Sequence, residues 1–126
     1  MTWVNWLLIG TGGFCGAIMR YTIGVWIGRK FASVFPYGTL AVNVIGSFAL
    51  GCLLGSALLD GGLPRIHTFT ISLLGAFTTF SAYAAESLQL LRARRLKLFA
   101  AYQAVSYSAA VSAAALGWFI GRWIAL

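Results

Sequence analysis

Residues 31–59, FASVFPYGTLAVNVIGSFALGCLLGSALL, contain no Asp, Glu, Lys or Arg over 29 positions. Three further runs lack the same four residue types, over 19, 20 and 24 positions: residues 1–19, 66–85 and 98–121. A helix needs about 20 consecutive apolar residues to cross a bilayer. The runs therefore predict an all-α membrane protein with four transmembrane helices, at about 3–27, 39–59, 68–91 and 98–124, in a single domain over residues 1–126.

The composition of the whole chain also indicates a membrane protein. Of its 126 residues, 60% are hydrophobic and 9% are charged, whereas a soluble domain carries about 25% charged residues. Most of the cations lie where the apolar runs end, which is typical of loops at lipid headgroups and not of a nucleic-acid-binding face. We therefore expect a multi-pass protein of the cell (inner) membrane, surrounded by the lipid bilayer and without a nucleic-acid partner.

The loop charges predict an orientation in that membrane. The first and third loops together carry six Lys and Arg, and the opposite side carries two. The six are Arg29, Lys30, Arg92, Arg94, Arg95 and Lys97, and the two are Arg65 and Arg122. Because cytoplasmic loops are enriched in Lys and Arg, the first and third loops are predicted to face the cytoplasm, with both termini outside.

Small residues recur four positions apart in the predicted helices. This spacing lets helix backbones approach closely in lipid, so it predicts tight helix packing without saying which helix is the partner. The sets are Gly12 with Gly16, Gly24 with Gly28, Ser47 with Gly51 and Gly55, and Gly117 with Gly121.

Three polar residues stand out within the apolar segments, where polar groups are costly and usually functional. Arg20 either extends its side chain to the headgroups or attracts an anion. Asn43 offers two donors and an acceptor, either to a ligand or to a neighbouring helix. Glu86 either pairs with Arg20, reaches the interface or serves as a proton site.

Residues 75–81, GAFTTFS, predict a local break near the middle of the third helix. Backbone groups freed by such a break must be buried in protein or line a cavity. Carbonyl oxygens of this kind suit a hard cation such as Na⁺. An intact helix, in which the threonine hydroxyls bond back to the preceding turn, is the alternative.

Three segments together resemble the signature segments of the CrcB/Fluc fluoride channels: residues 13–21, GFCGAIMRY, residues 38–48, GTLAVNVIGSF, and residues 75–81. The resemblance implies an antiparallel, dual-topology dimer that passively exports fluoride from the cytoplasm and so protects against fluoride toxicity. Such a protein is a channel and not an enzyme. The partner is expected to be a second copy of this chain, and the bias in loop charge leaves a heterodimer with an oppositely oriented paralogue as the alternative.

The resemblance also implies site residues. The family holds a structural Na⁺ at the dimer centre through backbone carbonyls, which here belong to Gly75 and Thr78. The polar and aromatic residues implied for the ion pathway are Arg20, Thr39, Asn43, Thr79, Phe80, Ser81, Tyr83, Glu86, Tyr102 and Ser106. The chain departs from the family pattern at Ala82, which lacks a hydroxyl, and at Tyr83, which replaces a phenylalanine.

Two other functions compete with the channel. A small proton-coupled multidrug exporter of organic cations is also built from short four-helix chains, and it would use Glu86, the only acid in a predicted span, as its proton site. The other alternative is an accessory subunit that transports nothing.

Overall fold

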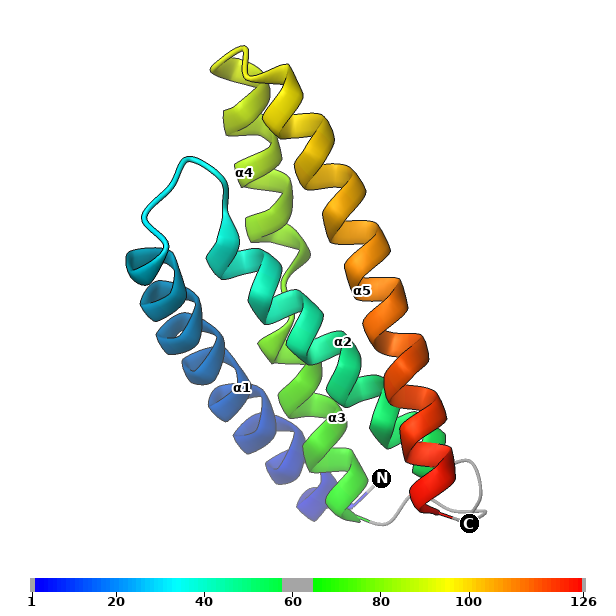
Figure 1. Cartoon of the computed structure of the whole chain (residues 1–126). Helices are drawn as coiled ribbons and strands as arrows, with labels where there is room; N and C mark the ends of the chain where they lie inside the picture. The colour runs from blue at the N-terminus through cyan, green and yellow to red at the C-terminus, as the bar shows by residue number, and fades with distance from the viewer. Residues whose placement is uncertain (1, 58–64, 126) are drawn as a thin grey trace.

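The computed structural model describes residues 2–57 and 65–125, which form five helices and no strand. They are α1 (Trp3–Lys30), α2 (Tyr37–Ala57), α3 (Arg65–Phe77), α4 (Phe80–Arg92) and α5 (Leu96–Ile124). In Figure 1, α1 and the α3–α4 pair run upward, whereas α2 and α5 run downward. The two chain ends therefore lie at the same end of the bundle.

Three segments of the described residues are long and apolar enough to cross a membrane: Tyr37–Ser56, Arg65–Arg92 and Leu96–Ile124. The second segment contains both α3 and α4. The helix α1 has 28 residues but is not among the three. The protein is therefore an all-helical membrane protein with at least three segments suited to span the bilayer.

The helix boundaries differ by at most three residues from the segments expected from the sequence at 3–27, 39–59, 68–91 and 98–124. The helix α1 continues past residue 27 through Arg29 and Lys30, and both cations lie in its last turn. Positive side chains are favourable in the last turn because a helix carries partial negative charge at its C-terminus. Residues 58 and 59, at the expected end of the second helix, lie outside the described residues.

Glycines bring α2 and α5 into backbone contact. A Cβ atom at Gly51 or Gly55 would collide with the carbonyl oxygens of Ala114 and Trp118 on α5. In return, a Cβ atom at Gly117 or Gly121 would collide with the carbonyl oxygens of Phe48 and Cys52 on α2. The small residues predicted from the sequence to mediate close packing therefore pair α2 with α5 of the same chain.

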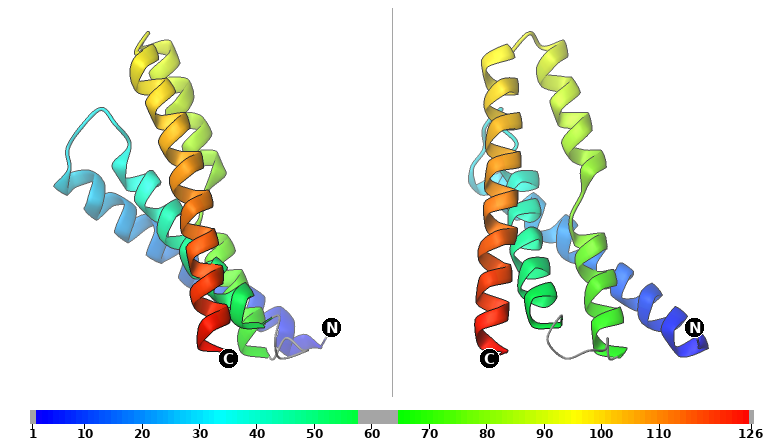
Figure 2. Two further views of the ribbon diagram at one scale, coloured as in Figure 1. Left: turned by 45° about the vertical axis from the view of Figure 1, so that its right-hand side comes forward. Right: turned by 90° about the vertical axis from the view of Figure 1, so that its right-hand side faces the viewer.

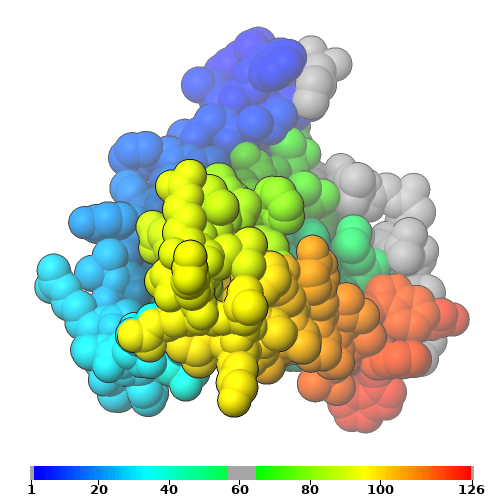
Figure 3. Space-filling model, turned by 90° about the horizontal axis from the view of Figure 1, so that it is seen from above, coloured from blue at the N-terminus to red at the C-terminus, as the bar shows by residue number. Residues whose placement is uncertain are grey.

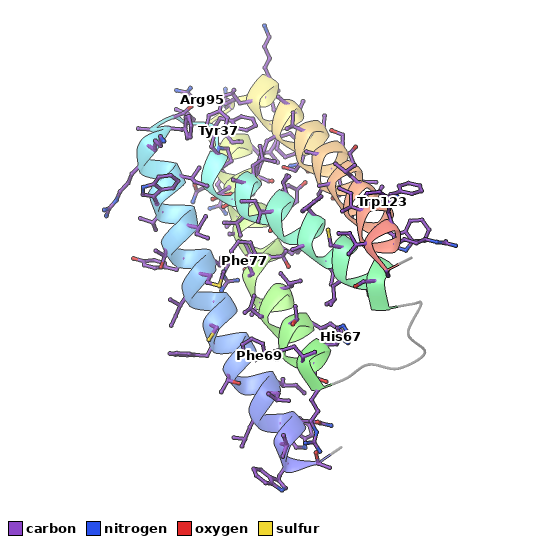
Figure 4. All side chains as sticks on the ribbon, turned by 60° about the horizontal axis from the view of Figure 1, so that its bottom comes forward. Tyr37, His67, Phe69, Phe77, Arg95 and Trp123 are labelled. Atoms are coloured by element: carbon purple, nitrogen blue, oxygen red, sulfur yellow. The ribbon has the colours of Figure 1, made fainter. Side chains whose placement is uncertain are left out.

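A second close contact joins α1 to α3. A Cβ atom at Gly12 would lie 2.6 Å from the carbonyl oxygen of Phe69, and one at Gly16 would collide with the carbonyl oxygen of Leu73. The hydroxyl of Ser72 donates a hydrogen bond of 2.6 Å to the carbonyl of Ile9. Figure 4 labels Phe69 on α3, where that helix faces α1.

The two ends of the bundle differ in charge. The α1–α2 connection and the α4–α5 turn lie together at the upper end, as the view from above in Figure 3 shows. The helix ends and loops that lie there carry all six cations of the two basic loops, and Figure 4 labels one of them, Arg95. The loops expected to share one side therefore lie at the same end of the molecule.

Candidate functional site

The helical path between α3 and α4 is interrupted at Thr78 and Thr79, as the right-hand view of Figure 2 shows. Thr79 has an extended backbone, with φ −145° and ψ 123°, and it caps α4. Its hydroxyl oxygen accepts a bond of 3.2 Å from the backbone N–H of Ala82, as Thr commonly does at this position. The local sequence thus supplies the residue with which α4 begins.

The side-chain amide of Asn43, on α2, bonds the backbone of Thr79 within the interruption. Its Oδ1 accepts a 2.7 Å bond from the N–H of Thr79, and its Nδ2 donates a 2.9 Å bond to the carbonyl of the same residue. In a continuous α-helix the N–H of Thr79 would donate to the carbonyl of Gly75. Asn43 therefore replaces the helical partner of Thr79, which means that it makes the interhelical bond considered from the sequence.

A cavity of about 310 Å³, here called the break cavity, lies beside this interruption between α2, α4 and α5. Amide, hydroxyl and aromatic groups line most of it, and none of the lining side chains is charged. It brings together six residues that were predicted for the ion pathway or the metal: Asn43, Thr78, Thr79, Phe80, Tyr83 and Ser106.

Two residues of the break cavity have unsatisfied or exposed groups. The hydroxyl oxygen of Ser106 is buried and has no hydrogen-bond partner. Phe80 is 75% exposed in the isolated chain, and its ring centroid lies 5.7 Å from that of Tyr83. A buried hydroxyl without a partner is unusual and indicates a place for a bound group.

A second, wider cavity of about 670 Å³, here called the wide cavity, lies between α1, α2 and α4. It brings together five of the predicted residues: Arg20, Thr39, Thr79, Ser81 and Glu86. Thr79 lines both cavities, so the interruption lies between them. The hydroxyls of Thr79 and Ser81 lie 3.2 Å apart, within hydrogen-bonding distance.

Both carboxylate oxygens of Glu86 accept hydrogen bonds from hydroxyl groups. Thr39 on α2 donates to Oε1 at 2.7 Å, and Tyr102 on α5 donates to Oε2 at 2.8 Å. Arg20 lines the same cavity as Glu86, but the partners of the carboxylate are these two hydroxyls. Glu86 thus ties α4 to two neighbouring helices.

Tyr102 is fully buried and lines neither cavity. It belongs to an aromatic cluster in which its ring centroid lies 5.3 Å from Tyr83 and 5.5 Å from Phe35. Of the two residues expected to hold a metal, Thr78 lines the break cavity, whereas Gly75 is exposed on α3 and lines neither cavity.

Sequence reasoning missed a polar contact between α4 and α5. The hydroxyl of Tyr83 donates to Oε1 of Gln103, and Nε2 of Gln103 donates a 2.8 Å bond to the hydroxyl of Ser87. A signal was available, because Gln103 is the only side-chain amide in the uncharged run 98–121. A polar group in such a run is costly unless it has a partner.

The sequence matches the family model described as CrcB-like protein, Camphor Resistance (CrcB), over residues 7–118. The chain belongs to the CrcB family. This confirms the membership predicted from the three signature segments.

Relatives of this CrcB chain cover nearly its whole length. A protein of Geobacillus kaustophilus named fluoride-specific ion channel FluC 1 is 40% identical over 116 residues, which are 92% of this chain and 97% of the relative. The fluoride-specific ion channel FluC 2 of Bacillus thuringiensis is 37% identical over 91% of this chain and 95% of its own. The fluoride-specific ion channel FluC of Agrobacterium fabrum is 36% identical over 94% of this chain and 97% of its own.

The three CrcB segments meet around the interruption. The first segment, residues 13–21, packs Gly16 against Leu73 of α3, next to the third segment. The second segment, residues 38–48, supplies Asn43 to Thr79. It also places Gly46 so close to Thr78 that a Cβ atom at Gly46 would collide with the methyl group of Thr78.

Proposed function

We propose that this chain forms a fluoride-selective channel that passively exports fluoride from the cytoplasm, the activity that the names of its relatives state for them. The observation that carries the proposal is the break cavity, whose lining offers amide, hydroxyl and ring-edge hydrogens without any charged side chain. Aromatic rings carry partial positive charge at their edges. Such a lining replaces water around a small anion without trapping it.

Individual donors in the break cavity support this function. Nδ2 of Asn43 carries two hydrogens, of which one is donated to the carbonyl of Thr79, so the other is free for an ion. Ser106 contributes a buried hydroxyl without a partner, and Phe80 contributes an exposed ring. Together these groups give an anion three kinds of donor.

The wide cavity has the character of an entrance to the break cavity. Arg20 places a cation in its wall, and the net charge of +7 favours the approach of anions. Glu86 lies in the same wall, but Thr39 and Tyr102 each donate a hydrogen bond to its carboxylate. An ion that moves from this cavity to the break cavity passes Thr79, which lines both.

The proposed architecture has four membrane crossings: α1, α2, the interrupted α3–α4 pair and α5. In support, α1 has no charged side chain before Arg20 and packs against the spanning segment Arg65–Arg92 through Gly12 and Gly16. With this arrangement the first and third loops of one chain lie on the same side of the membrane, and the positive-inside rule favours the cytoplasmic side for that chain. An inverted partner would place its own loops on the other side.

The proposed functional unit is an antiparallel dimer, with a second copy of this chain or with an oppositely oriented paralogue. Phe80 is 75% exposed although it lines the break cavity, and Gly75 beside the interruption is also exposed. An inverted second copy would cover both, so the ion pathway would be completed by two chains.

A structural Na⁺ at the centre of that dimer is part of the proposal, held by the carbonyls of Gly75 and Thr78. The residues fit such an ion, because the N–H of Thr79 bonds Asn43 and leaves the Gly75 carbonyl without its helical partner. Among the residues that the structure describes, that carbonyl accepts one long hydrogen bond of 3.5 Å, from the Thr78 hydroxyl. Neutral carbonyl oxygens suit Na⁺, which would neutralise their partial negative charge and hold the two interruptions together.

Efflux from liposomes tests the function. Purified protein is reconstituted into vesicles loaded with fluoride and chloride, valinomycin is added to balance the charge, and a fluoride electrode records release. The proposal predicts rapid release of fluoride and retention of chloride. Proton-driven uptake of a cationic dye would instead support the exporter, and vesicles that neither release fluoride nor take up the dye would support an accessory subunit.

A further inference from the structure

The hydroxyl of Tyr83 bonds a residue that does not line the break cavity, although Tyr83 itself lines that cavity. The hydroxyl donates to Oε1 of Gln103, and Nε2 of Gln103 donates to Ser87. Neither Gln103 nor Ser87 lines the break cavity or the wide cavity. The cavity therefore meets the ring of Tyr83, while the polar end of the side chain is held between α4 and α5.

The ring of Tyr83 also has a defined orientation. Its centroid lies 5.7 Å from Phe80, 5.3 Å from Tyr102 and, in an edge arrangement, 6.0 Å from Tyr107. Tyr83 is 8% exposed and thus buried. These packing contacts and the bond at the hydroxyl together hold the ring in this position.

We propose that Gln103 is a positioning residue for ion conduction: it binds the hydroxyl of Tyr83 so that Tyr83 presents ring hydrogens, and not its O–H group, to the ion. This inference rests on the proposed function, which makes the break cavity the ion pathway. On this inference the hydroxyl of Tyr83 does not contact the ion, because it is bound by Gln103, which lies outside the cavity.

The chemical reason is the strength of the two kinds of contact. A hydroxyl donates a strong, charge-assisted hydrogen bond to an anion, whereas a ring edge attracts it weakly. A buried hydroxyl without a partner is also unfavourable. Without Gln103 the hydroxyl of Tyr83 turns to the ion that its own ring borders, and the ion is held more tightly and released more slowly.

The test measures fluoride release against fluoride concentration in liposomes containing Gln103→Met, which keeps the length of the side chain and removes both of its bonds. The half-saturating fluoride concentration and the maximal rate are each expected to fall about tenfold. A defect limited to folding would lower the rate without changing the half-saturating concentration. The double variant Tyr83→Phe/Gln103→Met lacks the hydroxyl and is expected to return both values to within about twofold of wild type.

Three further variants complete the test. Gln89→Met is the matched control on the exposed side of α4, and Ser87→Ala removes the other bond of Gln103. Both are expected to keep the half-saturating concentration. Tyr83→Phe is measured as the reference for the double variant, because it lacks the hydroxyl that Gln103 binds, and Gln103→Ala is tested in the same two backgrounds if Gln103→Met does not fold.

The possible failures are distinguishable. Wild-type vesicles that retain fluoride refute the proposed function. If the wild type conducts, an unchanged half-saturating concentration in Gln103→Met refutes the role of Gln103 alone. An equal fall of the half-saturating concentration when Gln103→Met is added to the wild type and to Tyr83→Phe refutes it as well, because the effect would then not depend on the hydroxyl of Tyr83.

Discussion

Asn43→Asp is the substitution with the most specific expected effect, because it alters one of the two bonds that hold the helix interruption. The change replaces Nδ2, which donates a 2.9 Å bond to the carbonyl of Thr79, by a carboxylate oxygen. The other bond, from the N–H of Thr79 to Oδ1 at 2.7 Å, is kept. Two acceptor oxygens therefore face each other where a donor and an acceptor lay before.

The magnitude follows from the lost bond. Removing the donor leaves the buried carbonyl of Thr79 unsatisfied, which costs about 1–3 kcal/mol. This cost corresponds to a roughly 5- to 150-fold lower occupancy of the arrangement seen here. The new carboxylate also adds a negative charge to a cavity proposed to pass an anion, so we expect fluoride efflux to fall by at least about tenfold.

Efflux from liposomes with a fluoride electrode measures the effect, with equal amounts of folded protein verified by gel filtration. Asn5→Asp is a matched control, because it makes the same change in charge in the first turn of α1, where a negative side chain is favourable. Asn43→Asp channels that release fluoride at the rate of Asn5→Asp channels would refute both the role of the two bonds between Asn43 and Thr79 and the placement of the ion pathway.

Three other substitutions test separate parts of the structure. Phe80→Ile removes an exposed ring from the break cavity and is expected to lower fluoride flux at an unchanged melting temperature; wild-type rates would exclude Phe80 from the pathway. Tyr102→Phe removes one of the two donors to Glu86 and is expected to lower the free energy of unfolding by about 1–3 kcal/mol, as denaturant titration in detergent would measure; an unchanged midpoint would mean that this bond contributes nothing. Gly121→Ala places a methyl group against backbone of α2 and is expected to cost at least about 1–3 kcal/mol, whereas Gly10→Ala, which meets no atom within 4 Å, serves as its control in the same titration.

Much of the candidate site could be predicted from single residues in apolar runs. Asn43 and Glu86 were identified because a polar group in lipid needs a reason to be there. The bonds they make were not predictable, because these bonds join residues 36, 47 and 16 positions apart, and one sequence contains no information on which distant residues meet. The partner expected for Glu86 was thus left open between Arg20 and the interface, whereas the structure provides two hydroxyls.

The small-residue pattern predicted close helix contacts, but it did not predict which of the small residues make them. It predicted close approach at Gly51, Gly55, Gly117 and Gly121, and the structure pairs these glycines across α2 and α5. It also included Gly28, where a Cβ atom would meet nothing within 4 Å. A spacing of four residues places side chains on one face of a helix, but whether that face is covered depends on the rest of the fold.

Gln103 was missed for a related reason. It lies in a run of alanine and serine on α5, in which its amide does not interrupt the apolar character of the segment. Its importance depends on Tyr83, a residue that was itself interpreted as a departure from a family pattern. The hydroxyl of Tyr83 and the amide of Gln103 compensate each other, so each one considered alone looks like a costly polar group in a membrane helix.

On the proposed pathway the two cavities would have different roles in anion conduction, and electrostatics explains the difference. A full positive charge in a poorly solvated site would bind a small anion strongly and release it slowly, because Coulomb attraction increases as the effective dielectric constant falls. The arginine of the site, Arg20, lines the wide cavity, and the break cavity has only dipoles in its wall. On this pathway the wide cavity would attract the anion and the break cavity would transfer it. Thr79, which Asn43 binds, lies between the two cavities. On the proposed pathway the helix interruption would serve conduction as well as packing, because a continuous helix would engage the N–H of Thr79 and leave Asn43 without its partner.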